Sequence, residues 1–84
     1  MSSLLTAFTF ASQLNQHGKG LLILYAVSKA LNIDADFKNV PNGVKAQVWN
    51  GATAAINELS QTERLAFAKS LIDEIGGQLQ KAGA

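Results

Sequence analysis

One stretch of the sequence constrains the fold more than any other, because residues 21–27 are all apolar. They read Leu-Leu-Ile-Leu-Tyr-Ala-Val, so a helix through them has no polar side over two turns. A helix that is apolar all round is buried, either in a protein core or beneath a partner. The stretch is far shorter than the roughly 20 apolar residues that span a bilayer, so we expect no membrane span. It therefore predicts a central helix, or a helix that a partner covers.

The rest of the chain is also patterned as helix. Its apolar residues recur at intervals of three and four, are mostly Ala and Leu, and include few β-branched residues. We expect an all-α fold, a compact four-helix domain packed as an up-down-like or orthogonal bundle, with helices over about residues 3–16, 19–32, 43–59 and 61–76. Residues 1–84 are expected to form a single helical domain, with 77–84 as a tail that frays or resumes helix.

Glycines and capping residues predict where the helices begin and end. Gly18 and Gly20 are expected to end the first helix, which would place His17 at a helix C-terminus, where a cation is favourable. Gly76-Gly77 is expected to end the fourth helix. Residues 60–63, Ser-Gln-Thr-Glu, form a capping box, in which the Ser and Glu side chains satisfy each other's free backbone amides. The last two helices should therefore meet at a sharp corner.

Two further features bear on packing. Turn-forming residues fill 34–42, the only substantial loop expected, with Phe37 and Val40 as apolar anchors beneath it. Gly51 and the pair Ala54-Ala55 are small, so we expect another helix to approach the third helix closely.

Residues that usually carry catalysis or hold metals are scarce. The chain has no cysteine and one histidine, His17, which excludes thiolate zinc sites, iron–sulfur clusters and histidine-rich metal sites. Residues 34–36, Asp-Ala-Asp, open like a calcium loop, but the twelfth position is Lys45 rather than Glu. Residues 18–20, Gly-Lys-Gly, lack the spacing of a phosphate loop and are interpreted as a helix–helix turn. We therefore predict no enzyme, no catalytic residue, no metal site and no cofactor.

Charge is sparse and spread evenly along the chain. Seven basic and six acidic residues give a net charge of +1, with no basic stripe that could neutralise several phosphates. We therefore expect no nucleic-acid binding. The neighbouring carboxylates Asp73 and Glu74 point about 100° apart on a helix and are expected on a solvated face. The first sixteen residues contain no Lys or Arg, so we expect no signal peptide and a cytoplasmic protein.

The remaining apolar mass exceeds what one 84-residue core is expected to hide. Large exposed apolar patches mark interaction sites, and aromatic residues often anchor them. The candidate interface residues are therefore Phe10, Tyr25, Trp49 and Phe67, and the alternative for Trp49 is that it is the largest core residue of a small bundle. We expect a small non-enzymatic interaction or regulatory protein, a homo-oligomer (dimer or higher) that docks an apolar helical surface on a protein partner. The alternative is a carrier of a small apolar ligand, pigment- or lipid-like, held between helices.

One segment resembles a known family. Residues 59–66, Leu-Ser-Gln-Thr-Glu-Arg-Leu-Ala, followed by Glu74-Ile75-Gly76, are similar to a helix in the all-helical N-terminal domain of orange carotenoid proteins. The likeness covers about eighteen of the 84 residues, and a capping box before any amphipathic helix gives the same pattern. No carotenoid-contacting position is matched, so the resemblance transfers no site. It adds weight only to the apolar-ligand alternative.

Overall fold

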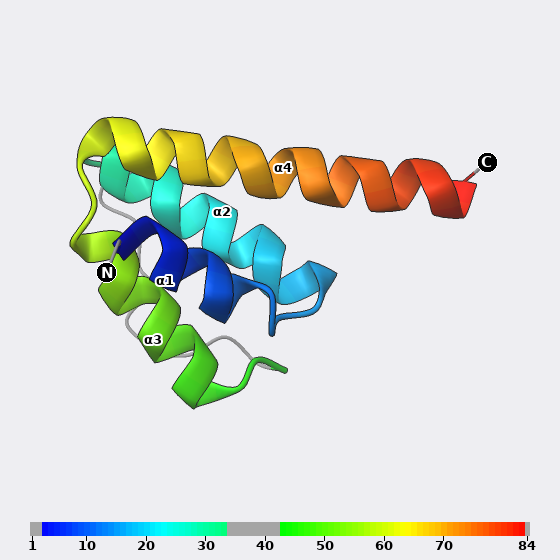
Figure 1. Ribbon diagram of the computed structural model, residues 1–84, viewed down its shortest axis with the longest axis horizontal. Coiled ribbons are helices and arrows are strands. Elements are labelled where there is room, and N and C mark those ends of the chain that lie inside the picture. Colours follow the sequence, from blue (N-terminus) through cyan, green and yellow to red (C-terminus); the bar gives the residue numbers. More distant parts are fainter. Residues whose placement is uncertain (1–2, 34–42, 84) are drawn as a thin grey trace.

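Every regular element that the structure describes is an α-helix. The computed structural model describes residues 3–33 and 43–83, with side chains up to residue 78. Within these ranges there is no strand, and the helices are α1 (Ser3–Ala11), α2 (Gln16–Ala30), α3 (Ala46–Asn57) and α4 (Gln61–Gly83) (Figure 1). The prediction of an all-α fold with four helices is confirmed. The predicted loop anchors Phe37 and Val40 lie outside the described residues.

The helices pack most closely in two pairs, α2 with α4 and α1 with α3. The α2–α4 pair is antiparallel, because Gln16 at the start of α2 reaches Gln78 late in α4, with 3.3 Å between the side-chain amides. At the other end of the pair, the Arg64 guanidinium donates to the Lys29 carbonyl oxygen at 3.3 Å. Figure 1 shows α4 lying along one side of the bundle and extending past the other helices at its C-terminal end.

The core combines a few large residues with many alanines. The largest fully buried side chains are those of Phe67, Leu22, Ile56 and Leu71. Around them, six small side chains let the helix backbones approach closely, which gives the dense packing that protein interiors require. These residues are Ala7, Ala11, Ala26, Ala52, Ala55 and Ala68.

The first two helices are separated by a cap rather than by glycines. Asn15 is extended, and its side-chain oxygen accepts from the Gly18 backbone amide at 2.8 Å, so it starts α2 at Gln16. The prediction that the first helix reaches residue 16 and ends at Gly18 or Gly20 was wrong, because α1 ends at Ala11 and both glycines lie inside α2.

The ends of α2 and α3 also differ from the predicted ones. Asn32 adopts a left-handed backbone, and the Ile33 amide donates to the Ser28 carbonyl at 2.8 Å, the geometry of a Schellman-type helix end. Gly43 is also left-handed, with φ at 82°, so α3 cannot begin there and starts at Ala46 after the extended residue Lys45.

The start of α4 follows the predicted capping box. The Ser60 backbone amide donates to Glu63 Oε1 at 3.0 Å, and the Glu63 amide donates to Ser60 Oγ at 3.1 Å. The prediction that Gly76-Gly77 ends the helix was wrong, since α4 continues through both glycines to Gly83. Glycine loses more conformational entropy than other residues when it folds into a helix. Glu74 and Gln78, on either side of the two glycines, both bond to α2, and these contacts offset that cost.

The apolar stretch at 21–27 is not buried on all sides. Leu22, Tyr25 and Ala26 are buried in the core, whereas the Leu24 side chain is 57% exposed. The stretch therefore lies in a helix that contacts both α3 and α4 but leaves one side uncovered. On α1, the Leu5 side chain is 59% exposed, whereas Ala7 and Ala11 are buried in the core.

The prediction of a close approach at Gly51 is confirmed. A Cβ atom placed on Gly51 would lie 2.5 Å from two ring carbons of Phe10, so the α1 side chain occupies the space that any other residue would fill. This contact uses Phe10 to join α1 to α3.

We expect Gly51→Ala to lower the free energy of unfolding by about 1 kcal/mol, because overpacking typically costs ~1–3 kcal/mol and outweighs the gain in helix propensity. The matched control is Gly77→Ala, where a Cβ would meet nothing within 4 Å. It should raise the free energy of unfolding by roughly 0.5–1 kcal/mol. Urea denaturation followed by circular dichroism, at one protein concentration, measures both, and an equal effect of the two variants would contradict the packing argument.

Candidate interaction surface

Three of the four predicted interface residues belong to the core of the chain itself. Tyr25, Trp49 and Phe67 are 7%, 2% and 0% exposed. The structure brings Tyr25 and Trp49 together edge to face, with ring centroids 6.0 Å apart, and Asn57 donates to the Tyr25 hydroxyl at 2.9 Å. Phe67 packs separately against Phe8, at 4.8 Å between centroids.

Phe10, the fourth predicted residue, is partly buried over Gly51. The four aromatic residues therefore do not form one exposed patch. No assembled form of the protein is described, so their role in an interface stays a prediction.

The large apolar side chains that do remain exposed were not among the four predicted interface residues. They are between 44% and 59% exposed, and they are Leu5, Leu24, Leu31, Ile33, Leu65 and Ile72. Four of them form two pairs with a spacing of seven residues, which is two helical turns, so the members of each pair share one side of their helix. One pair is Leu24 in α2 with Leu31 at the C-cap of that helix, and the other pair, Leu65 and Ile72, lies in α4. The seven-residue spacing is visible in the sequence, but buried pairs such as Val48 and Ala55 share it, so it does not by itself identify exposed residues.

The α2 pair lies on the side away from α3. Tyr25 marks the side of α2 that faces α3, through Trp49, and Lys19 marks the side that faces α4, through Glu74. Successive residues are turned by about 100° around the helix axis. In one direction around α2 from Tyr25, Lys19 comes first, and Leu31 and Leu24 come next. The exposed leucines therefore lie beyond the contact with α4.

The α4 pair is placed in the same way. Phe67 marks the side of α4 that faces α1, through Phe8, and Arg64 marks the side that faces α2, through the Lys29 carbonyl. In one direction around α4 from Phe67, Arg64 comes first, and Ile72 and Leu65 come next. These exposed residues therefore lie beyond the contact with α2, on the side away from α1.

Both pairs thus flank the α2–α4 contact on the side that α1 and α3 leave uncovered. We call this surface, made by Leu24, Leu31, Leu65 and Ile72, the outer face. Gly20 and Gly76 share the same sides of their helices, and a Cβ at either glycine would meet nothing within 4 Å. The outer face is accordingly apolar, and it is open to close approach at both glycines.

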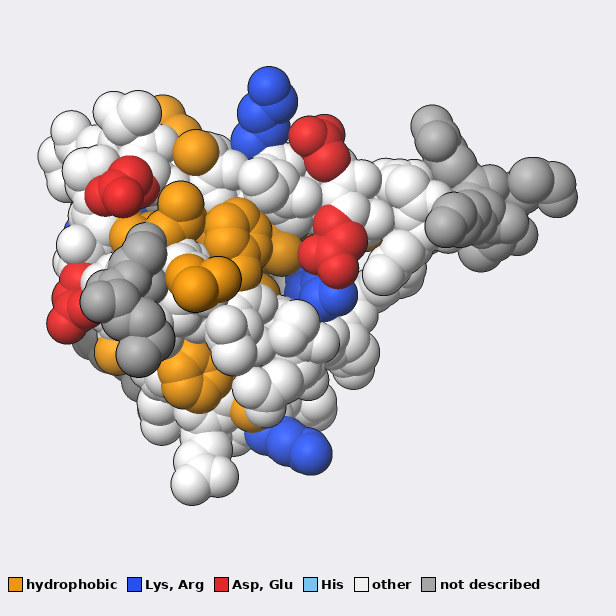
Figure 2. Space-filling model, in the orientation of Figure 1, with side chains coloured by type: hydrophobic (Ala, Val, Ile, Leu, Met, Phe, Trp, Pro, Cys, Tyr) orange, Lys and Arg blue, Asp and Glu red, His pale blue; other side chains and the backbone are white. Residues whose placement is uncertain are grey.

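Apolar side chains on another side of the molecule are better covered. Figure 2 shows hydrophobic side chains gathered between α1 and α4, with acidic and basic side chains along α4. The α1 residues Leu4 and Phe8 there are partly buried against the core. On α1 only Leu5 is a large apolar residue that is mostly exposed, so this helix offers one such side chain where the outer face offers four.

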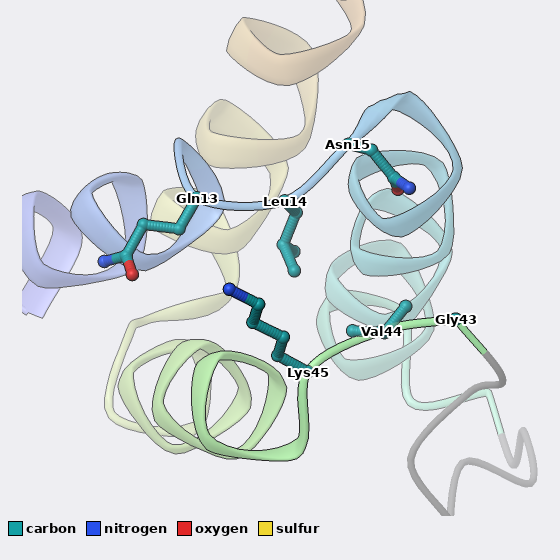
Figure 3. Close-up of a pocket in the computed structure, with 6 residues that line it drawn as sticks. All are labelled: Gln13, Leu14, Asn15, Gly43, Val44 and Lys45. Atoms are coloured by element: carbon teal, nitrogen blue, oxygen red, sulfur yellow. The ribbon is translucent and has the colours of Figure 1, made fainter.

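A small hollow lies between the α1–α2 turn and the start of α3. It has a volume of about 170 Å³ and is lined by Gln13, Leu14, Asn15, Gly43, Val44 and Lys45 (Figure 3). The Asn15 side chain already caps α2, and the lining is as polar as it is apolar. Pockets for drug-sized ligands usually measure ~300–1,000 Å³ and are mostly apolar, so this hollow is small for a pigment or a lipid.

The lysine of the former Gly-Lys-Gly motif has a structural partner. Lys19 is buried, and its Nζ lies 3.1 Å from Glu74 Oε1 in an ion pair between α2 and α4. The prediction of a helix–helix turn at 18–20 was wrong, because these residues form the first turns of α2. Glu74 is on an exposed part of α4 but pairs with this lysine, whereas Asp73 is exposed as predicted.

The other titratable candidates are dispersed. His17 is exposed in the first turn of α2, not at a helix C-terminus as predicted, so the helix dipole does not favour a cation there. Asp34 and Asp36 lie outside the described residues. Across 3–33 and 43–83, no three His, Cys, Asp or Glu residues are grouped so that they could hold a metal ion. None of the helices described has the length and apolar character that crossing a membrane requires.

Comparison with known proteins assigns no relative. No protein family matches the chain, and no curated protein or solved structure is significantly similar to it. The resemblance to the orange carotenoid protein domain therefore stays a prediction.

The Lys19–Glu74 pair can be tested by removing each partner. We expect Glu74→Ala to lower the free energy of unfolding by about 1 kcal/mol, at the low end of the range for a lost charged partner because Glu74 is nearly half exposed. Lys19→Met should be neutral within about 0.5 kcal/mol, because it replaces a buried cation by an apolar side chain of similar length. Thermal denaturation measures both, and a larger loss for Lys19→Met than for Glu74→Ala would contradict the assignment.

Proposed function

We propose that the protein is a small interaction protein that self-associates and docks the outer face on a polypeptide partner. The exposure of Leu24, Leu31, Leu65 and Ile72 on one side of the α2–α4 pair is the observation that carries this proposal. Monomeric proteins rarely expose contiguous apolar surface of this kind unless it is used in binding.

The free energy gained by covering these four side chains supports a binding role for the outer face. Each of the four side chains is about half exposed, so covering it contributes on the order of 1 kcal/mol, half the value for burying a whole Leu or Ile. The four side chains of one copy together contribute about 4 kcal/mol. A symmetric dimer covers eight such side chains and gains about 8 kcal/mol. This gain falls within the ~4–15 kcal/mol range that association costs in lost freedom, so the expected complex is reversible and depends on protein concentration.

The chemistry of the outer face limits the class of partner that it can bind. The outer face presents aliphatic side chains on two antiparallel helices, a geometry that accepts another amphipathic helix or helix pair. Its apolar character favours a polypeptide over a nucleic acid, which would require a cluster of cations. The small, partly polar hollow beside Lys45 gives less support to the apolar-ligand carrier. The cytoplasmic location also stays a prediction.

We expect the double variant Leu24→Gln with Ile72→Gln to weaken self-association about 1,000-fold, because the two substitutions remove four of the eight apolar side chains covered in a symmetric dimer, each worth about 1 kcal/mol. Glutamine is a good helix former, so the fold should be kept, which circular dichroism checks. Sedimentation equilibrium across concentration measures the dissociation constant. The matched control is Leu5→Gln, an equally exposed leucine on α1.

An equal loss in the control would show that the outer face is not the interface. A wild-type protein that stays monomeric at the highest soluble concentration would overturn the proposal of self-association.

A further inference from the structure

The middle residue of α4 lies on the outer face. Ile72 is the middle residue of α4, which spans Gln61–Gly83, and its side chain is 52% exposed. The seven-residue spacing from Leu65 to Ile72 is continued in the sequence by Leu79. The C-terminal part of α4 extends past the other helices of its own bundle (Figure 1). A second long helix laid antiparallel across Ile72 would cover both halves of α4 equally.

Charges beside Ile72 favour this antiparallel arrangement. Lys69 and Asp73 are both exposed and lie on the flank of the outer face that points away from α2. If a twofold axis crosses α4 near Ile72, Lys69 of each copy stands within about 3 Å, along the helix axis, of Asp73 of the other. A parallel pairing about an axis along α4 would instead place these flanks on opposite edges of the contact, where Lys69 of one copy does not meet Asp73 of the other. Opposite charges therefore meet only in the antiparallel arrangement.

The dimensions also suit a second copy. The 23 residues of α4 and the 15 of α2 give lengths of about 34 Å and 22 Å, and two adjacent helices are roughly 20 Å wide. Such a face is comparable with the ~800 Å² that each partner buries in a standard interface. Gly76, one turn after Ile72, has open space before it and permits the backbones to approach.

We propose that the polypeptide bound by the outer face is a second copy of this chain, docked with the two α4 helices antiparallel about a twofold axis near Ile72. Lys69 of each copy then pairs with Asp73 of the other at the rim of the contact. This inference rests on the proposed function, since it names the partner of the same surface.

A single cysteine tests the position of the axis, because the chain has no cysteine of its own. Residues on a twofold axis meet their own counterparts, so Ile72→Cys should form a disulfide-linked dimer rapidly under mild oxidation. The matched control is Leu5→Cys, which is similarly exposed on α1 and should link slowly. Cross-linking is followed by non-reducing electrophoresis below the concentration at which random collision dominates.

A charge exchange tests the orientation. Lys69→Asp alone and Asp73→Lys alone should each weaken the dimer about tenfold, because two rim pairs are replaced by repulsion. The double variant Lys69→Asp with Asp73→Lys should restore the wild-type dissociation constant, because the pairs re-form with signs reversed. Circular dichroism of the single variants controls for helix content.

The outcomes separate this inference from the proposed function. If the wild-type protein dimerises but Ile72→Cys links no faster than Leu5→Cys, the arrangement is wrong while the proposed function stands. Failure of the charge exchange to restore binding overturns the antiparallel orientation. A wild-type protein that is monomeric at all concentrations overturns the self-association on which both proposals rest.

Discussion

One cation, the Arg64 guanidinium in the first turns of α4, links the start of this helix to the ends of α2 and α3. It donates to the carbonyl oxygens of Ile56 and Asn57 at 2.9 Å and to that of Lys29 at 3.3 Å. These carbonyls lie at the C-terminal ends of α3 and α2, where backbone acceptors lack helical partners and the helix dipole leaves partial negative charge. A single side chain therefore satisfies two helix ends and fixes where α4 starts relative to both. Because α4 begins there, its remaining length is committed to run back along α2.

The far end of the α2–α4 pair is fixed by a second cation. Lys19 is buried, and its pairing with Glu74 at 3.1 Å compensates for the loss of hydration that a buried ammonium suffers. The two contacts lie ten residues apart on α2 and on α4, so they set both the register and the antiparallel direction. Once these are set, helical geometry alone decides which side of each helix is left over. The outer face thus follows from the register and direction of α2 and α4.

The sequence predicted what local chemistry decides. The capping box at Ser60 and Glu63 lies within four residues, and Gly51 signals a close approach wherever its neighbour comes from, so both predictions were confirmed. The errors arose where two local signals competed or where the partner is distant. Asn15 caps α2 more effectively than Gly18 ends α1, and Gly76-Gly77 stays helical because contacts to α2, from residues about 55 to 62 positions away in sequence, hold the helix on both sides. The exposed side of the 21–27 stretch likewise depends on which helices pack against it.

The apolar excess of the composition follows from the way the core is built. Alanines fill much of the contact between helices, so the backbones lie close together and each contact buries little apolar area per residue. Longer side chains that flank such a close contact cannot enter it. Leu24 and Leu31 on α2, with Leu65 and Ile72 on α4, are therefore left beside the contact rather than inside it. An alanine-rich core in a short chain leaves some of its large aliphatic residues at the surface. Here the register of α2 and α4 gathers four of them on one side, where a second helical surface can cover them together.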